Sequence, residues 1–126
     1  MIFDLINKKY DGRIELQEPV NCDISNLPES LREILMKSNG IKETMNHPKT
    51  GELMYIGWII YSYEEMIRAT EYYKKEYGIS GIVFSDDGAG DPFYLEEDKV
   101  YCFDVIDNES EWKADSLSEF FVEDFD

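Results

Sequence analysis

The sequence has few basic residues and few of the residue types that ordinarily carry catalysis. Its 126 residues include 12 lysines and arginines against 28 aspartates and glutamates, which gives a formal net charge of −16, and a single histidine. A negative field of this size repels phosphate backbones and anionic lipid, whereas it attracts a basic protein. The composition therefore argues against direct binding of nucleic acid and favours a basic protein partner.

Export signals, long apolar runs and paired cysteines are also missing. The N-terminal segment MIFDLINKKY has no basic region ahead of an apolar core. The longest apolar run, LMYIGWIIY at 53–61, has about half the length that a membrane helix needs. Cys22 and Cys102 stand alone without a CxxC pattern, so we expect both to be reduced core residues. These absences predict a cytoplasmic protein that is not attached to a membrane.

The residues that are present predict one folded domain spanning 1–126. Hydrophobic residues make up 43% of the chain and aromatic residues 14%, which is too much for a disordered acidic tail. The acidity is uneven: residues 1–63 carry 7 basic and 9 acidic groups (net −2), whereas residues 64–126 carry 5 and 19 (net −14). The chain is long enough for one core and too short for two.

Capping and spacing patterns predict the helices. Leu27, Leu31 and Ile34 share one face of a segment that Asn26 can cap. Two capping boxes, Ser62 with Glu65 and Ser116 with Glu119, open two further helices. The later of these carries Leu117, Phe120, Phe121 and Phe125. We therefore expect helices at 27–38, 63–77 and 117–123, and a short helix at 2–9.

Apolar, β-branched and aromatic runs predict strands at 53–61, 82–85, 92–95 and 100–105. Short turns such as EEDK at 96–99 pair consecutive strands antiparallel. The expected fold is therefore α+β, a single domain with one predominantly antiparallel twisted sheet flanked by helices. Trp58, Phe84 and Phe103 should be mostly buried in its core.

The stretch SDDGAGDPFYL at 85–95 invites three functional interpretations. A dinucleotide fingerprint would need a third glycine where Phe93 stands, and a calcium loop would need glycine where Asp91 stands. A pair of carboxylates could in principle hydrolyse a glycoside, but no companion pattern supports this. His47 lies in a polar turn without catalytic partners, as a solvated surface group. We therefore expect no enzyme activity, no catalytic or metal-binding residues and no cofactor.

The structural interpretation of this stretch is a tight turn in which aspartates accept bonds from backbone amides. That does not explain why acidity continues, with 15 acidic and 2 basic residues from position 86 onward. A merely solvated face remains the alternative to an acidic surface that meets a partner. The candidate partner-binding residues are Asp86, Asp87, Asp91, Glu96, Glu97, Asp98, Asp104, Asp107, Glu109 and Glu111.

Five segments in a fixed order carry a resemblance to a known family. They are LPESLREILMKSNG, a strand with GW, the turn DDGAGDPFYL, the strand VYCFDV and the closing SLSEFF. Over about residues 25–122 the chain resembles the SUKH superfamily. Asn39-Gly40 and the turn 87–91 match the family's pattern, although Ile41 and Ala89 replace frequent glycines.

The resemblance implies an α+β domain without cofactor or chemistry of its own. Bacterial members of the superfamily are mostly immunity proteins that bind and neutralise a cognate toxin, often a nuclease. A basic nuclease would fit the acidic composition. The alternative that the resemblance implies is an intracellular regulatory or scaffolding module, related to yeast regulators of cell-wall glucan synthesis.

Overall fold

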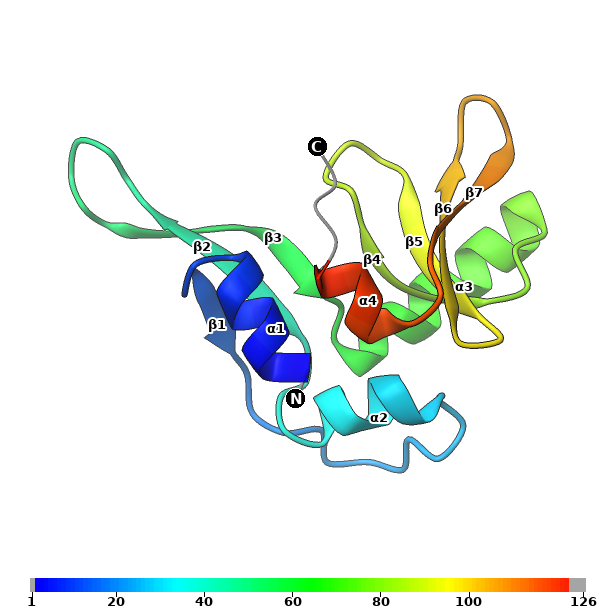
Figure 1. Cartoon of the computed structure of the whole chain (residues 1–126), viewed down its shortest axis with the longest axis horizontal. Coiled ribbons are helices and arrows are strands. Elements are labelled where there is room, and N and C mark those ends of the chain that lie inside the picture. Colours follow the sequence, from blue (N-terminus) through cyan, green and yellow to red (C-terminus); the bar gives the residue numbers. More distant parts are fainter. Residues whose placement is uncertain (1, 123–126) are drawn as a thin grey trace.

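The computed structural model describes residues 2–122, which form four helices and seven strands (Figure 1). In chain order these elements are α1 (Ile2–Lys9), β1 (Ile14–Leu16), α2 (Glu29–Leu35), β2 (Ile41–Asn46), β3 (Leu53–Ile60), α3 (Tyr63–Tyr77), β4 (Ile82–Asp86), β5 (Pro92–Glu96), β6 (Lys99–Asp104), β7 (Glu109–Ala114) and α4 (Leu117–Val122).

The serines of both predicted capping boxes cap their helices. The Ser62 hydroxyl oxygen accepts a hydrogen bond from the Glu65 N–H at 3.3 Å, and α3 ends at Gly78 with φ of 75°. The Ser116 hydroxyl oxygen accepts from the Glu119 N–H at 3.1 Å at the start of α4. The predicted end of this last helix at residue 123, and Phe125, lie outside the described residues.

The prediction for α2 is wrong at both ends. The helix begins at Glu29, directly after Pro28, and no side chain caps it. Asn26 is no cap because it lies in the preceding turn, where its Oδ1 accepts from the Tyr63 hydroxyl at 3.2 Å. After Leu35 the chain turns instead of continuing to residue 38, and the Ser38 N–H still bonds to the Ile34 carbonyl.

The strands are antiparallel throughout, but they form two sheets where the sequence predicts one. A three-stranded sheet has the order β1-β2-β3, and a four-stranded meander has the order β4-β5-β6-β7. Within residues 2–122, one backbone hydrogen bond joins the two sheets, from the Tyr61 N–H to the Phe84 carbonyl at 2.8 Å. Beyond this bond β3 and β4 diverge, and the β2–β3 hairpin projects away from the body (Figure 1).

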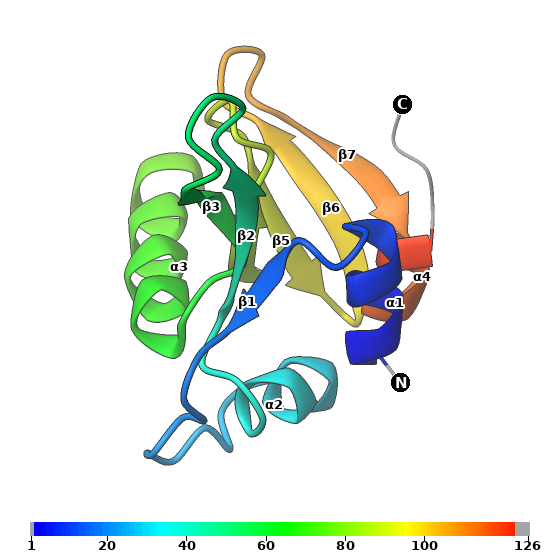
Figure 2. The ribbon, with the colours of Figure 1, turned by 90° about the vertical axis from the view of Figure 1, so that its left-hand side faces the viewer.

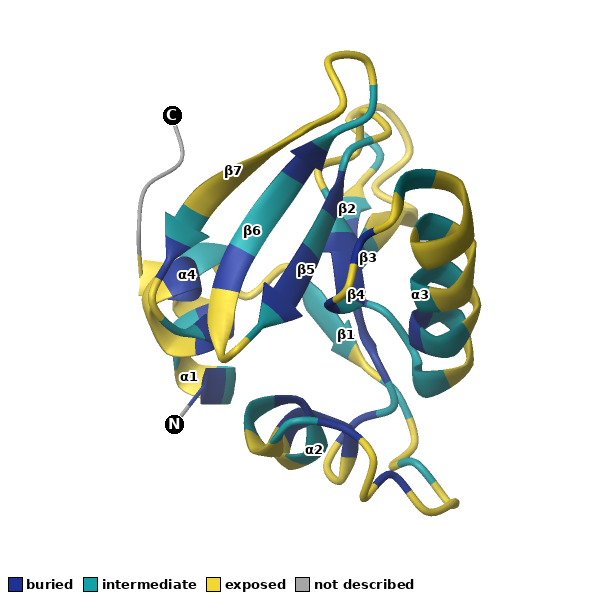
Figure 3. Cartoon of the chain, turned by 90° about the vertical axis from the view of Figure 1, so that its right-hand side faces the viewer, coloured by how far each residue is buried: buried dark blue, intermediate teal, exposed yellow. Residues whose placement is uncertain are grey.

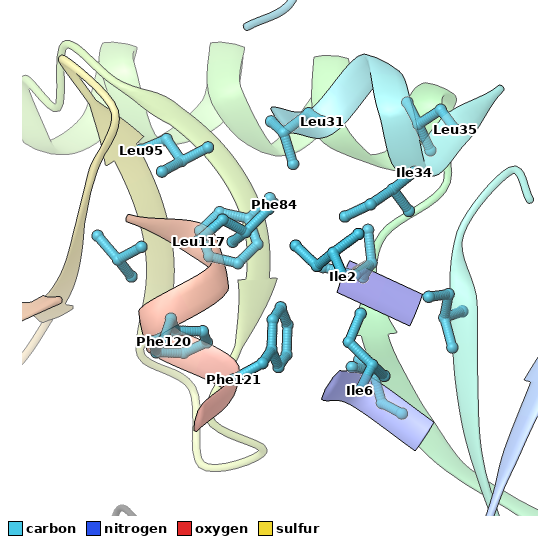
Figure 4. Close-up of a cluster of buried hydrophobic side chains, with 14 of the residues drawn as sticks. Ile2, Ile6, Leu31, Ile34, Leu35, Phe84, Leu95, Leu117, Phe120 and Phe121 are labelled. Atoms are coloured by element: carbon cyan, nitrogen blue, oxygen red, sulfur yellow. The ribbon is translucent and has the colours of Figure 1, made fainter. Parts of the chain in front are cut away.

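The helices cover both faces of the meander, with α3 on one side and α1 and α4 on the other (Figure 2). The main core lies on the second side, where α2 also packs, and Figure 4 shows its aromatic centre around Phe84 and Phe120. These two rings meet edge to face at 5.9 Å. The apolar faces predicted for α2 and α4 are thus confirmed as core.

A smaller cluster lies between α3 and the meander. Val83, Tyr94 and Phe103 pack there against Tyr73 and Tyr77 of the helix. The burial of Phe103, like that of Phe84, is therefore confirmed.

Burial along β3 differs from the prediction. The strand is exposed from Leu53 to Gly57, and Trp58 is half-buried, because this half belongs to the projecting hairpin and no layer of the described residues covers it (Figure 3). Cys22 is also exposed rather than in the core, since it lies in the loop before α2, whereas Cys102 is half-buried on β6.

Candidate protein-binding surface

Two acidic turns lie side by side at one end of the meander. The β4–β5 connection (86–91) and the β6–β7 connection (104–109) share this end because successive strands of a meander reverse direction. Both segments contain only acidic charged residues, with no lysine or arginine. The six carboxylates, here called the acidic end, belong to Asp86, Asp87, Asp91, Asp104, Asp107 and Glu109.

The first turn is shaped by its own aspartates. The Asp87 Oδ1 accepts from the N–H of Ala89 at 2.8 Å and from the N–H of Asp91 at 3.0 Å. The Asp86 Oδ1 accepts from the Gly88 N–H at 2.8 Å. The stretch is therefore a tight turn closed by side-chain acceptors, as the structural interpretation of the sequence predicts.

Aspartates also join the two turns. The Asp91 Oδ1 accepts from the Val105 N–H of the second turn at 3.1 Å. Within that second turn the Asp104 Oδ1 accepts from the N–H groups of Ile106 and Asp107 at 2.9 and 3.0 Å. In the acidic end, four aspartates thus accept hydrogen bonds from backbone N–H groups, and these bonds fix the two turns in place while the side chains supply negative charge.

Asp86 is also bound from the side of β3. The Tyr61 hydroxyl donates to the Asp86 Oδ2 at 2.5 Å. Burial, and then the hydrogen bond to the Asp86 carboxylate, raise the pKa of Tyr61 well above its ordinary value. Tyr61 therefore stays a neutral donor and fixes the carboxylate at the junction of the two sheets.

One turn of the acidic end also carries an exposed apolar side chain. Ile106 is 90% exposed, between Asp104 and Asp107 at the tip of the β6–β7 connection. An exposed isoleucine in a turn that also carries carboxylates offers a partner both hydrophobic contact and charge.

The other candidate carboxylates lie elsewhere. Glu96, Glu97 and Asp98 form the β5–β6 turn at the opposite end of the meander, and Glu96 accepts there from the Ser80 hydroxyl. Glu111 lies on β7 and pairs with Lys113 at 3.3 Å. The ten candidates therefore divide between two ends and one strand of the meander.

Sequence reasoning missed the apolar hairpin beside the acidic end. Leu53, Met54, Tyr55 and Ile56 of β3 are each 42 to 54% exposed. On one face Lys42 Nζ lies 4.9 Å from the Tyr55 ring centroid and 5.1 Å from that of Trp58. A continuous apolar strand is typical of a buried one, so the sequence carries no signal that this segment projects.

A cleft of about 580 Å³ opens where β3 and β4 diverge. Residues 56–59 of β3 form one wall and residues 85–88 the other. Phe93, Phe120 and Phe121 contribute apolar surface, and Glu43 adds a carboxylate. The cleft therefore joins an apolar interior to part of the acidic end.

The described residues hold no grouping of three His, Cys, Asp or Glu side chains that could bind a metal. None of the helices in that part of the chain has the length and apolar character of a membrane span. The His47 Nδ1 accepts from the N–H groups of Lys49 and Thr50, so this half-buried histidine shapes the tip of the β2–β3 hairpin.

Comparison with known proteins gives one match. The sequence model of the SMI1 / KNR4 family (SUKH-1) matches residues 15–123, from β1 to just beyond α4. No curated protein and no solved structure matches the chain.

Proposed function

The chain belongs to the SMI1 / KNR4 family (SUKH-1), and from this membership we propose that it is an immunity protein that neutralises a cognate toxin in the cytoplasm. The partner would be a basic protein, and a nuclease fits best because it must itself attract phosphate. The second candidate is an intracellular regulatory or scaffolding module that binds a protein without neutralising it.

The observation that carries the proposal is the acidic end. Six carboxylates without a basic neighbour in the same two turns would hold a basic surface, and four of them are already fixed by backbone contacts. Such preorganisation lowers the entropy that binding costs. Ile106, at the exposed tip of the second turn, would enter an apolar depression of the toxin.

Neutralisation would then be a blockade. The immunity protein would cover the nucleic-acid surface of the toxin, or a patch beside it, and compete by charge and by volume. No bond is made or broken, so we propose no turnover and no cofactor.

The direct experiment identifies the protein retained by the tagged chain when it is purified from its native host. The retained protein is then expressed alone and together with the chain in a sensitive cell. Toxicity that co-expression relieves would support immunity. A retained protein without toxicity would contradict immunity and support the regulatory alternative.

A pair of variants tests the surface. Asp107→Lys with Glu109→Lys reverses two exposed charges of the acidic end. Glu97→Lys with Asp98→Lys makes the same change in net charge at the opposite end. We expect the first pair to slow association with the toxin about tenfold at low salt and the second to have a smaller effect.

The salt dependence provides an independent measurement. Association with the wild-type chain should slow as salt rises, because the Debye length falls to about 10 Å at 0.1 M. Equal effects of the two variant pairs, or binding that salt does not change, would show that the acidic end is only solvated.

A further inference from the structure

The strand β3 has a free edge beside the cleft. It is the last strand of the three-stranded sheet, and β2 pairs with its other edge. Among the described residues, the bond from the Tyr61 N–H to the Phe84 carbonyl is the one backbone link between the two sheets, and it lies just beyond the end of β3. A free edge presents N–H and C=O groups that an added strand can pair.

The cleft gives that edge a shape suited to an extended chain. One wall is residues 56–59 of β3. The other is residues 85–88, which are the end of β4 and the start of the turn after it, and the walls open outward from the Tyr61 junction. Ile56, which is 53% exposed, lines the wall at the mouth, and Phe93 lies deeper on β5. An added strand would therefore find a backbone template on one side and apolar surface along it.

The negative charge of the cleft favours a partner segment that carries positive charge. Of the described residues, Glu43, Asp86 and Asp87 line the cleft with negative charge, and Lys9 is the one basic residue in its lining. The cleft also continues into the acidic end, since it shares Asp86 and Asp87. An extended segment that carries Lys or Arg beside apolar residues would complement both features.

We propose that an extended segment of a basic partner protein adds to the free edge of β3 in this cleft. Apolar side chains of the segment contact Ile56 and Phe93, and its Lys or Arg side chains lie beside Glu43 and Asp87. The proposal rests on the proposed function only for the protein nature of the partner. It adds a second contact region, next to the acidic end.

The test uses a random dodecapeptide library displayed on phage and selected on the purified full-length chain. We expect enriched peptides that alternate β-branched or aromatic residues with Lys or Arg. On binding of a synthetic enriched peptide, hydrogen exchange should slow at the amides of 56–59. Failure to enrich such peptides, or protection confined to other elements, would overturn the proposal.

Matched variants locate the contact. Glu43→Gln with Asp87→Asn removes two charges from the cleft while the asparagine keeps an acceptor for the turn amides. Glu97→Gln with Asp98→Asn makes the same change at the far end of the meander. The first pair should weaken peptide binding about tenfold and the second by less than about twofold.

A second comparison concerns the apolar contact. Ile56→Ala should weaken peptide binding about fivefold, whereas Leu53→Ala should not, although the two side chains are 53% and 54% exposed. Leu53 lies at the hairpin tip, outside the cleft lining. N-methylation of alternate peptide amides should also abolish binding if backbone pairing occurs, and tolerance of every N-methyl group would contradict strand addition.

Peptide-binding experiments also test two other possible occupants of the cleft, which are residues 123–126 of this chain and a second copy of it. A chain truncated after Val122 that binds the peptides while the full chain does not would assign the cleft to residues 123–126. Concentration-dependent dimers that Ile56→Ala abolishes would assign it to a second copy. Either result overturns the proposal. If variants of the cleft lost peptide binding but still protected against the toxin, this inference would be wrong and the immunity function would stand.

Discussion

Gly40 lies directly before β2, where the chain passes Trp58 of β3. Its φ is +94°, and a Cβ at this position would stand 2.6 Å from Trp58 Cζ3 and 2.8 Å from the Ser62 N. We expect Gly40→Ala to lower the free energy of unfolding by about 2 to 4 kcal/mol, from backbone strain and overpacking together. Urea unfolding followed by circular dichroism measures the loss.

The control for Gly40 is Gly51 at the hairpin tip. It has a φ of +72°, and a Cβ there would meet nothing within 4 Å. Gly51→Ala should therefore cost about 1 kcal/mol, the backbone part alone. If both variants lost the same stability, the contact with Trp58 would have no role.

The two cysteines should react at very different rates. Burial, and then the carboxylates of Asp87 and Asp91, raise the pKa of Cys102 to about 11. At pH 8 about one Cys102 thiol in a thousand is then ionised. We expect iodoacetamide to modify the exposed Cys22 first, as peptide mass spectrometry would show. Equal modification of the native protein would mean that Cys102 is not shielded, and urea should remove the difference.

Among the elements, α3 and β4 are fastened together by a side chain. The Val83 N–H donates to the Thr70 Oγ1 at 3.0 Å, and Val83 is fully buried. Thr70→Val would leave this N–H without an acceptor and should cost about 1 to 3 kcal/mol. Thr70→Ser keeps the hydroxyl and should lose clearly less. Thermal melts of both variants test this, and equal losses would assign the effect to packing.

Sequence patterns predict the elements that carry strong local signals. The capping boxes locate α3 and α4, and the apolar runs locate β3 to β6. The same patterns miss the strands β1, β2 and β7 because these are short or polar, as IEL, IKETMN and ESEWKA show. Such strands form because a neighbour pairs with them, and pairing is not a local property.

The site follows the same division. The sequence predicts the acidity of the second half of the chain, and it also predicts the aspartate turn at 86–91. The meeting of 86–91 with 104–109 is not, because it depends on the register of β5 and β6. The exposure of Ile56 and the cleft depend on the divergence of β3 from β4, which no single segment encodes.

For the whole molecule, partly and fully buried tyrosines predict a loss of stability in alkali. Burial is the largest cause that raises the pKa of Tyr10, Tyr61, Tyr73 and Tyr94. In the unfolded chain these groups ionise near pH 10, so above about pH 10 the folded state holds more protons. Their contribution is therefore complete below that pH and falls as the pH rises further.

Urea unfolding at pH 8, 10 and 11 tests the alkaline loss. Tyr61→Phe should be less stable at pH 8, because the bond to Asp86 is gone, and its stability should fall less steeply with pH. High salt in a parallel series separates this effect from general charge repulsion. A wild-type stability that stays constant to pH 11 would contradict the prediction.

The packing of α1 against α4 has a consequence for biosynthesis. Ile2 and Ile6 share one core with Leu117, Phe120 and Phe121, so the earliest and latest described helices complete each other. While the ribosome is still translating the meander, the first helix can meet α2 and the first sheet, but the part of the core that Leu117, Phe120 and Phe121 supply is still missing. Part of the apolar face of α1 therefore stays exposed to solvent or to a chaperone until α4 leaves the ribosome, and only then can the main core be completed.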